Sequence, residues 1–308
     1  MRIYYFRLSK MKNQLLFFCL LFPAFSFSQE NKTLSSKQTK IEIHGHRGFR
    51  GRFPENTLIA FKEAIKAGAD YIELDVIISK DSQVVVSHEP WFNPKTCTAP
   101  DGKAITKRTK NNLHQLNYAE IKKYDCGKRG NKKFPQQLKT EVFKPLLSEV
   151  IEEMEKYTQE NNLPPIYYNI EIKNNSMGDR KYHYSTKTTV ALINDVLKKY
   201  AVNDRILIQS FDVRCLKEIH TLNPELKTGL LIANLRSVKH NIRKLHFTPA
   251  YYNPALKICK KKTIRQAHQS GCKVVVWTVN SQKEMVKFRD LGVDGIITDY
   301  PNFATILK

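Results

Sequence analysis

The sequence has no series of long hydrophobic runs, and it is short of acidic residues. Its most apolar stretch, Leu15–Phe25, is shorter than the roughly 20 residues that a membrane-spanning helix needs. Hydrophobic residues make up 41% and charged residues 26% of the 308 residues, which excludes a disordered, a collagen-like or a multi-span membrane protein. The 29 Asp and Glu face 51 Lys and Arg, for a net charge of +22. This imbalance favours anionic surroundings such as phosphate, nucleic acid or acidic lipid.

The first residues have the pattern of a secretory signal peptide. Basic residues precede the Leu15–Phe25 run, and Ser26 and Ser28 place small side chains before a cut at Gln29. We therefore expect a signal peptide over 1–28, a linker over 29–40, and one barrel domain over 41–308 in an exported protein, periplasmic or secreted. An uncleaved N-terminal anchor is the alternative, and translation could also start at Met11.

The cysteines lack CxxC spacing, which disfavours a structural zinc site. Export permits disulfides, and five cysteines remain after residue 28, so at least one thiol stays free or pairs between chains. Cys97 and Cys126 flank one polar, lysine-rich segment and are the pair that we expect, although the sequence leaves the pairing open.

Strand-like runs alternate with amphipathic helical stretches from Ile41 onward, which predicts a largely parallel sheet. About eight strands favour an α/β fold of the TIM-type (β/α)₈ barrel class. An open doubly wound sheet is the alternative, but no glycine-rich phosphate loop follows the first strand. The predicted strands are Ile41–His46, Tyr71–Val76, Val84–His88, Tyr167–Ile172, Ile206–Ser210, Thr228–Ile232, Val274–Val279 and Gly295–Thr298, with a further one beginning at Tyr251.

Two connections depart from this alternation. Only Lys80–Gln83 joins the second and third strands, which is too short for a parallel crossover and predicts a hairpin. A turn centred between Asp81 and Ser82 would place Asp75 opposite His88. The basic, polar segment 94–144 predicts a long insertion after the third strand, over one mouth of the barrel, with helix near residues 118–124. Such a segment is either a lid or binding loop or a solvated flap.

Acidic residues alternate along two predicted strands. Glu73 and Asp75 are two apart and share a face, and Asn169, Glu171 and Lys173 do the same on the fourth strand. Carboxylates buried together are costly unless one is protonated or a cation holds them ionised. Oxygen ligands favour Mg²⁺ or Ca²⁺ over zinc, so we expect one divalent cation, Ca²⁺ or Mg²⁺. A solvated acidic patch is the alternative.

Two histidines lie at the ends of the first and third predicted strands. His46 and His88 converge on the acids and can divide general base and general acid duties, while Arg47 and Lys173 can hold phosphate oxygens. Together these residues indicate hydrolysis of a phosphate ester. We also assign Glu55 to substrate binding, although the run Pro54–Thr57 has an alternative reading as an ordinary helix start.

The motifs that carry this chemistry resemble those of a known family. The run HGHRGFRGRFPENTLIAFKEAIKAGADYIELDVIISKDSQVVVSHEP is similar to the signature of the glycerophosphodiester phosphodiesterases, which are related in fold to phosphatidylinositol-specific phospholipase C. NIEIK, QSFD, VVVWTVN and GVDGIITDYP match later motifs. The resemblance implies a TIM barrel, a divalent metal, and hydrolysis of glycerophosphodiesters to glycerol 3-phosphate and an alcohol. Ser82 stands where the family often has Gly, and Glu89 where it often has Asp.

Carried over by position, the resemblance implies a role for each candidate residue. It implies Glu73, Asp75 and Glu171 as metal ligands and His46 and His88 as the acid/base pair. It implies that Arg47 and Lys173 contact phosphate and that Trp277 lines the pocket. The nucleophile could be water or a neighbouring glycerol hydroxyl, which would give a cyclic phosphate.

Other substrates and partners stay open. A lysophospholipid or an envelope-polymer phosphodiesterase, or a non-catalytic envelope-binding barrel, is also compatible with the composition. The expected partner is a small-molecule or lipid-derived phosphodiester, with peripheral contact to an anionic membrane. No nucleic-acid partner is expected, because aromatic residues do not interleave the basic runs. The candidate basic patches, or simply solvated faces, are Lys107–Lys110, Lys128–Lys133 and Lys260–Lys262.

Overall fold

The computed structural model describes residues 40–106 and 111–307. The predicted signal peptide, nearly all of the linker and the Lys107–Lys110 patch lie outside the described residues. Over the described ranges, none of the helices combines the length and the apolar character needed to cross a bilayer.

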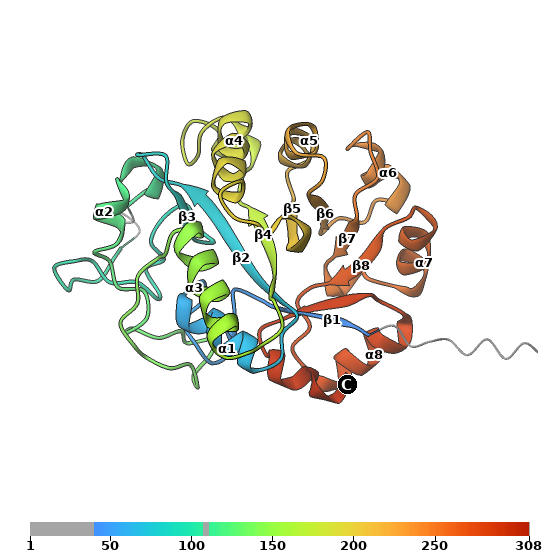
Figure 1. Cartoon of the computed structure of the whole chain (residues 1–308), viewed down its shortest axis with the longest axis horizontal. Helices are drawn as coiled ribbons and strands as arrows, with labels where there is room; N and C mark the ends of the chain where they lie inside the picture. Colours follow the sequence, from blue (N-terminus) through green and yellow to red (C-terminus); the bar gives the residue numbers. More distant parts are fainter. Residues whose placement is uncertain (1–39, 107–110, 308) are drawn as a thin grey trace, which may run out of the picture. The chain divides into compact units, whose positions relative to one another are not determined.

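Eight parallel strands close into a barrel in the described part of the chain (Figure 1), which confirms the TIM-type class. β1 pairs with β9 on one side and with β2 on the other, so that the sheet has no gap between its first and last parallel strands. β3 pairs antiparallel with β2 outside the barrel. The strands are β1 Glu42–Gly45, β2 Tyr71–Ile78, β3 Val84–Val86, β4 Tyr167–Ile172, β5 Ile206–Ser210, β6 Lys227–Ile232, β7 Tyr251–Pro254, β8 Lys273–Val276 and β9 Gly295–Thr298.

Amphipathic helices cover the outside of the barrel, and Figure 1 shows α4 to α7 along strands β4 to β8. Short 3-10 turns occupy 113–115, 176–178, 203–205, 256–258 and 301–307. The helices are α1 Leu58–Lys66, α2 Tyr118–Ile121, α3 Leu147–Glu160, α4 Thr186–Leu197, α5 Val213–Leu222, α6 Val238–Arg243, α7 Lys261–Gln269 and α8 Gln282–Leu291.

Helix α1 shows how the sequence sets such an element. Thr57 is its N-cap, with Oγ1 accepting a hydrogen bond from the Ala60 backbone N–H at 3.3 Å. Such a cap stabilises a helix by about 1 kcal/mol. Phe61, Ala64 and Ile65 are buried on one face against the barrel, so packing and capping both fix where the helix begins.

The two ends of the barrel lumen differ in character. Tyr71, Leu207, Tyr251, Val275 and Ile297 form an apolar cluster inside the barrel toward the strand N-termini. Two residues farther along β2, β5 and β7, and just after β9, the buried side chains are Glu73, Gln209, Asn253 and Asp299. The packed lower lumen therefore gives a rigid base to a polar C-terminal mouth, where barrel enzymes place their sites.

The hairpin between β2 and β3 is confirmed, but its predicted register was wrong. Val76 pairs with Val86, and the Ser87 N–H donates to the carbonyl of Asp75 at 2.8 Å, so Asp75 lies opposite Ser87 rather than His88. The turn has an odd number of residues because Ser82 takes a left-handed φ of 62°. Gln83 also accepts from and donates to Ser79, which closes the turn one residue earlier than predicted.

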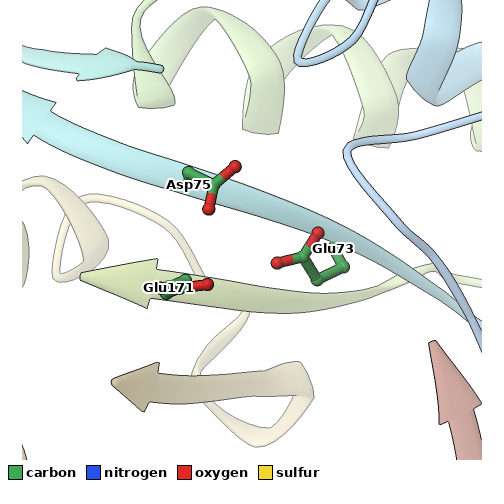
Figure 2. A group of neighbouring side chains, drawn as sticks. All are labelled: Glu73, Asp75 and Glu171. Carbon is green, nitrogen blue, oxygen red and sulfur yellow. The ribbon is translucent and has the colours of Figure 1, made fainter. Parts of the chain in front are cut away.

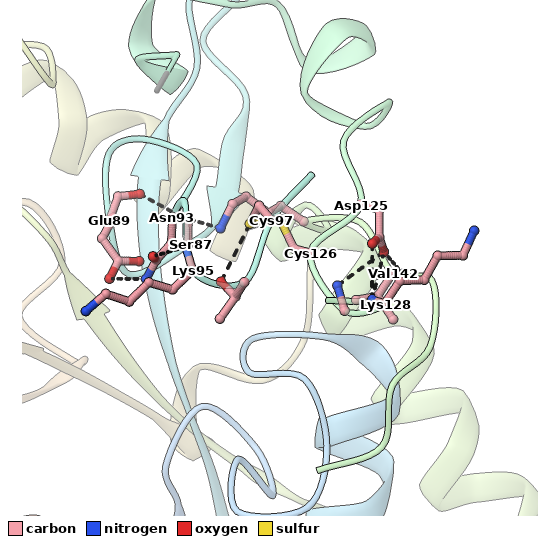
Figure 3. Close-up of a disulfide and its surroundings, with 12 residues drawn as sticks. Ser87, Glu89, Asn93, Lys95, Cys97, Asp125, Cys126, Lys128 and Val142 are labelled. Carbon is pink, nitrogen blue, oxygen red and sulfur yellow. Dashed lines mark hydrogen bonds between the residues drawn. A yellow bond between two sulfur atoms is a disulfide. The ribbon is translucent and has the colours of Figure 1, made fainter. Parts of the chain in front are cut away.

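The segment 94–144 carries a core of its own. Cys97, Ile105, Leu113, Ile121 and Tyr124 are its buried apolar residues in this cluster, and α2 lies within the predicted helical stretch. Cys97 and Cys126 form the expected disulfide (Figure 3). The thiols of the other three described cysteines are free and buried. This organised interior distinguishes the insertion from a simple solvated flap.

The insertion packs against the mouth of the barrel next to β1. Gln137 Nε2 donates to the carbonyls of Arg50 and Phe53, each at 2.8 Å, and the Leu138 N–H donates to the Arg52 carbonyl at 2.7 Å. Beyond the disulfide, the carboxylate of Asp125 accepts from several backbone N–H groups (Figure 3). The insertion thereby holds the loop that carries Arg50, which belongs to the site below.

Candidate active site

Three carboxylates meet inside the C-terminal mouth. Glu73 and Asp75 project from β2 and Glu171 from the adjacent β4 (Figure 2), with Asp75 directly opposite Glu171 in the sheet. Each offers an oxygen within 4.8 Å of the others. Glu73 and Asp75 are 1% exposed and Glu171 is 8% exposed. The two-residue spacing noted in the sequence therefore places all three on the lumen face of neighbouring strands.

Burial and mutual repulsion shift the pKa values of this cluster. Burial raises the pKa of Glu73 well above its ordinary value, and the negative charges of Asp75 and Glu171 raise it further. Burial also raises the pKa of Glu171, against the opposing effect of Lys173. Although burial disfavours its ionised form too, the charges of Arg47 and Lys173 hold the pKa of Asp75 far below its usual range. Burial and repulsion therefore disfavour three negative charges at this site.

The donor set fits a hard divalent cation. All the ligand atoms are carboxylate oxygens, which Ca²⁺ and Mg²⁺ prefer. Since the oxygens all lie within 4.8 Å of one another, one ion could contact all three carboxylates. The raised pKa of Glu73 supports the same interpretation, because a cation would supply the missing positive charge.

His46 follows β1, and a neighbouring carboxylate fixes the position of its ring. Its Nδ1 lies 2.6 Å from Oδ1 of Asp299, at the end of β9. Asp299 is in turn held by Asn280, whose Nδ2 donates to Oδ2 at 2.7 Å. Burial lowers the pKa of His46, partly offset by the charge of Asp299. With Nδ1 engaged, Nε2 is the nitrogen that can exchange a proton with substrate.

His88 follows β3 and lies near the same carboxylates despite the corrected register. Its Nδ1 lies 3.3 Å from Oε1 of Glu89. It also interacts electrostatically with Asp75 and Glu171. The structure therefore brings both predicted histidines to the mouth, each with a carboxylate beside its Nδ1.

Arg47 joins several parts of the site. Its backbone N–H donates to Glu73 Oε2 at 2.8 Å, its Nη1 donates to Glu55 Oε1 at 2.8 Å, and its Nε lies 3.3 Å from Asp75 Oδ2. Arg47 has a left-handed φ of 52°, and the next residue, Gly48, has φ 80°. A Cβ on Gly48 would lie 2.6 Å from the backbone of Ala60 in α1, so this turn requires glycine.

Glu55 anchors the arginines of this turn. Besides Arg47, it accepts a hydrogen bond from Arg50 Nε at 2.5 Å. Although burial disfavours its charge, the two arginines lower the pKa of Glu55 to about 2. The run Pro54–Thr57 is also a helix start, because Thr57 is the N-cap of α1. Glu55 therefore lies at the mouth with its carboxylate held by the two arginines, and its role in substrate binding stays a prediction.

Lys173 and Lys144 add cations at the mouth. Lys173 Nζ donates to Glu171 Oε1 at 2.7 Å and lies 3.7 Å from Asp75 Oδ1. Lys144, at the end of the insertion, donates to Ser87 Oγ at 2.9 Å. Burial lowers the pKa of Lys144, whereas the carboxylates raise that of Lys173 in spite of its burial. Both can face the oxygens of an anionic ligand.

The opposite wall of the mouth is apolar. Trp277 donates from Nε1 to the Asn253 carbonyl at 2.7 Å, which fixes the indole ring. Phe211 packs edge-on against it, with 5.5 Å between ring centroids. The mouth thus combines the charged groups over β1 to β4 with an aromatic pair, Phe211 after β5 and Trp277 after β8.

Several contributing residues were missed by the sequence reasoning. Asn56 Nδ2 donates to Asp75 Oδ2 at 2.9 Å, and Gln209 Nε2 donates to Glu73 Oε1 at 3.1 Å. Asp299, which holds His46, was also missed. Alternation along the fifth and ninth strands carries a usable signal, because Gln209 and Asp299 fall on the lumen face of their strands. Asn56 gives no such signal, since a polar residue at a helix start is ordinary.

Comparison with known proteins agrees with this geometry. The model of the Glycerophosphoryl diester phosphodiesterase family matches residues 46–303. A glycerophosphodiester phosphodiesterase from Bacillus altitudinis is 31% identical over 270 residues, covering 87% of this chain and 98% of the relative. A lysophospholipase D from Rattus norvegicus is 28% identical, covering 92% of this chain and 90% of its own length.

Solved structures share the fold. A protein from Silicibacter pomeroyi has a TM-score of 0.78 at 26% identity, over 87% of this chain and 93% of that one. An Oleispira antarctica phosphodiesterase, solved with its product sn-glycerol-3-phosphate, has a TM-score of 0.69 at 24% identity, over 86% and 96%. With the family match over nearly all of the barrel, this chain belongs to the glycerophosphoryl diester phosphodiesterase family.

Proposed function

We propose that this protein hydrolyses glycerophosphodiesters to glycerol 3-phosphate and an alcohol, with a divalent cation and two histidines as its catalytic groups. The proposal rests on the buried cluster of Glu73, Asp75 and Glu171, which lies beside His46 and His88 at one mouth of the barrel. The relative from Bacillus altitudinis bears this activity as its name. The Oleispira antarctica enzyme was solved with the corresponding product.

The charged half of the mouth suits a phosphodiester. Ca²⁺ or Mg²⁺ held by the three carboxylates would bind a phosphate oxygen and offset the negative charge that develops on it. Arg47 and Lys173 lie beside those carboxylates and can hold the other oxygens. Glu55 keeps the guanidinium of Arg47 in place through a 2.8 Å hydrogen bond.

The two imidazoles divide the proton transfers. One takes the proton of the nucleophile, and the other donates a proton to the leaving alkoxide. Each has its Nδ1 beside a carboxylate, Asp299 for His46 and Glu89 for His88, which leaves Nε2 for the exchange. Water as the nucleophile gives glycerol 3-phosphate directly, whereas the glycerol hydroxyl gives a cyclic phosphate that a second step opens.

A lysophospholipid is the second candidate substrate. The relative from Rattus norvegicus is named a lysophospholipase D. Next to Trp277, the ring of Phe211 borders a hollow of about 310 Å³ whose lining also includes Val213, Leu230 and Ile232. Such a wall suits an acyl chain, so we include a lipid-derived phosphodiester and contact with an anionic membrane in the proposal.

We also propose that the protein is exported, to a periplasm or out of the cell. The sequence of residues 1–28 carries this proposal, and the Cys97–Cys126 disulfide supports it, since such bonds persist in oxidising compartments.

The test is the release of glycerol 3-phosphate from glycerophosphocholine by the wild type, His46→Ala and His88→Ala, with folding checked by circular dichroism. Loss of a general acid or base should lower turnover by roughly 10²–10⁴-fold. Near-wild-type turnover in either variant would contradict the histidine roles. Release of phosphocholine and glycerol, in place of choline, would contradict the proposed bond cleavage.

A further inference from the structure

Exposed apolar side chains gather on the loops that follow β4, β5 and β6. Met177 is 90% exposed, Leu235 is 91% exposed and Phe211 is 44% exposed. Among the described residues, no other large hydrophobic side chain is more than 46% exposed. Nearly full exposure of Met177 and Leu235 has no packing explanation. Because these loops follow the C-terminal ends of barrel strands, all three side chains belong to the rim of the mouth.

The loops that carry these three side chains are neighbours along the rim. Phe211 and Asn234 line the same hollow of about 310 Å³, and Asn234 and Leu235 line a second hollow of about 350 Å³. The loop of Met177 is held to the segment after Phe211 by an ion pair, with 2.6 Å between Arg214 Nη1 and Asp179 Oδ2. Phe211 also contacts Trp277, so the rim continues into the proposed site.

Positive charge surrounds these apolar side chains. The loops 174–185, 211–214, 233–237 and 255–262 contain eight Lys and Arg against two acidic residues. Both acids, Asp179 and Asp212, pair with Arg214. The second hollow is lined by Arg236, Lys257, Lys260 and Lys262. The rim therefore carries exposed apolar side chains surrounded by Lys and Arg residues that outnumber the acidic residues.

We propose that this rim docks on an anionic lipid surface. We call it the lipid-facing rim, formed by Met177, Phe211, Leu235, Arg236, Lys257, Lys260 and Lys262. Apolar side chains that enter the headgroup region, ringed by Lys and Arg, are the pattern of peripheral membrane binding. Docking there turns the mouth toward the surface, so a single-chain glycerophospholipid reaches the site without leaving the lipid phase. This substrate route rests on the proposed function, whereas the docking itself does not.

The test measures sedimentation of the purified protein with vesicles. One set contains phosphatidylcholine with phosphatidylglycerol, and the other contains phosphatidylcholine alone. The variant is the double substitution Met177→Asp with Leu235→Asp. The matched control is Leu222→Asp, which changes a 44% exposed leucine at the last residue of α5, where that helix is farthest from the rim.

The wild type should bind the anionic vesicles more strongly than the neutral ones. Each inserted side chain contributes about tenfold to partitioning, so the double variant should lose about 100-fold while Leu222→Asp binds like the wild type. Turnover of water-soluble glycerophosphocholine should be equal in all three proteins. Turnover of lysophospholipid in anionic vesicles should fall only in the double variant.

Distinct outcomes overturn the docking and the function. Equal vesicle binding by the wild type and the double variant would overturn the docking surface. Binding that molar salt abolishes and the double variant retains would also overturn it, because the contact would then be purely electrostatic. Absence of glycerophosphocholine turnover in the wild type, with rim-dependent vesicle binding intact, would overturn the proposed function and leave the docking standing.

Discussion

The Nδ1 atom of His46 lies 2.6 Å from Oδ1 of Asp299, although 253 positions separate the two residues in the sequence. Closure of the barrel between β1 and β9 brings them together. Asn280 fixes both the side chain and the backbone of Asp299, through bonds of 2.7 and 2.9 Å. The histidine therefore has a positioned carboxylate behind it, which orients the ring and stabilises its protonated form.

Asp299→Asn should lower kcat by roughly 10²-fold with little change in KM, because an amide no longer stabilises the imidazolium. Loss of the carboxylate should also lower the pKa of His46 further, which shifts the pH profile of kcat. Steady-state kinetics over a range of pH checks both effects.

The matched control is Asp294→Asn. It removes the carboxylate of another His–Asp pair, in which His268 Nε2 lies 2.8 Å from Asp294 Oδ2, at the opposite end of β9 from Asp299. Its pH profile should match the wild type. The positioning role fails if Asp299→Asn also leaves the profile unchanged.

The Cys97–Cys126 disulfide should stabilise the insertion. It closes a loop with a sequence separation of 29, for which chain entropy predicts about 3–4 kcal/mol. Cys97→Ser with Cys126→Ser should lower the urea midpoint and make the segment 94–144 more sensitive to protease. Reducing agent should destabilise the wild type and leave the double variant unaffected. Equal midpoints for the oxidised wild type and the double variant would contradict this role.

Glu42 should make the barrel base sensitive to acid. Although burial opposes its charge, His44 and Lys273 lower the pKa of Glu42 to about 2. A lowered carboxyl pKa stabilises the fold above the unfolded value near 4.5, and this contribution is lost as the pH falls toward 2. Glu42→Gln should therefore reduce the free energy of unfolding by about 2 kcal/mol at pH 7, with the difference shrinking below pH 4.5.

Thermal unfolding at pH 7, 5 and 3 measures this difference. The matched control is Glu160→Gln, because Glu160 is exposed and lies 3.8 Å from Lys156 on the surface of α3. It should change stability little at any of these pH values. A destabilisation by Glu42→Gln that stays constant down to pH 3 would exclude the electrostatic explanation.

Much of the site could be predicted from local spacing. Glu73 and Asp75 share a strand face because side chains alternate, and the same rule places Glu171 in the lumen. The pairing of β2 with β4 then brings the three together. The barrel class followed from the alternation of strand and helix, which the closed parallel sheet confirms.

Long-range and turn-dependent features could not be predicted in this way. The partnership of His46 with Asp299 depends on barrel closure, which no local pattern encodes. The register of the hairpin was wrong because one left-handed residue, Ser82, changes the parity of the turn. The exposure of Leu235 depends on how its loop leaves β6, whereas the sequence shows only an apolar residue between polar ones.

The central claim is that Glu73, Asp75 and Glu171 hold a divalent cation that the reaction requires. The most direct measurement is glycerol 3-phosphate release from glycerophosphocholine after treatment with EDTA, followed by addition of Ca²⁺ or Mg²⁺, for the wild type and Asp75→Asn. Thermal unfolding in the same solutions reports ion binding independently of turnover. The wild type should lose release with EDTA and regain both release and thermal stability with one of the ions, whereas Asp75→Asn should regain neither. Undiminished release by the fully stripped wild type, or equal recovery by Asp75→Asn, would contradict the claim.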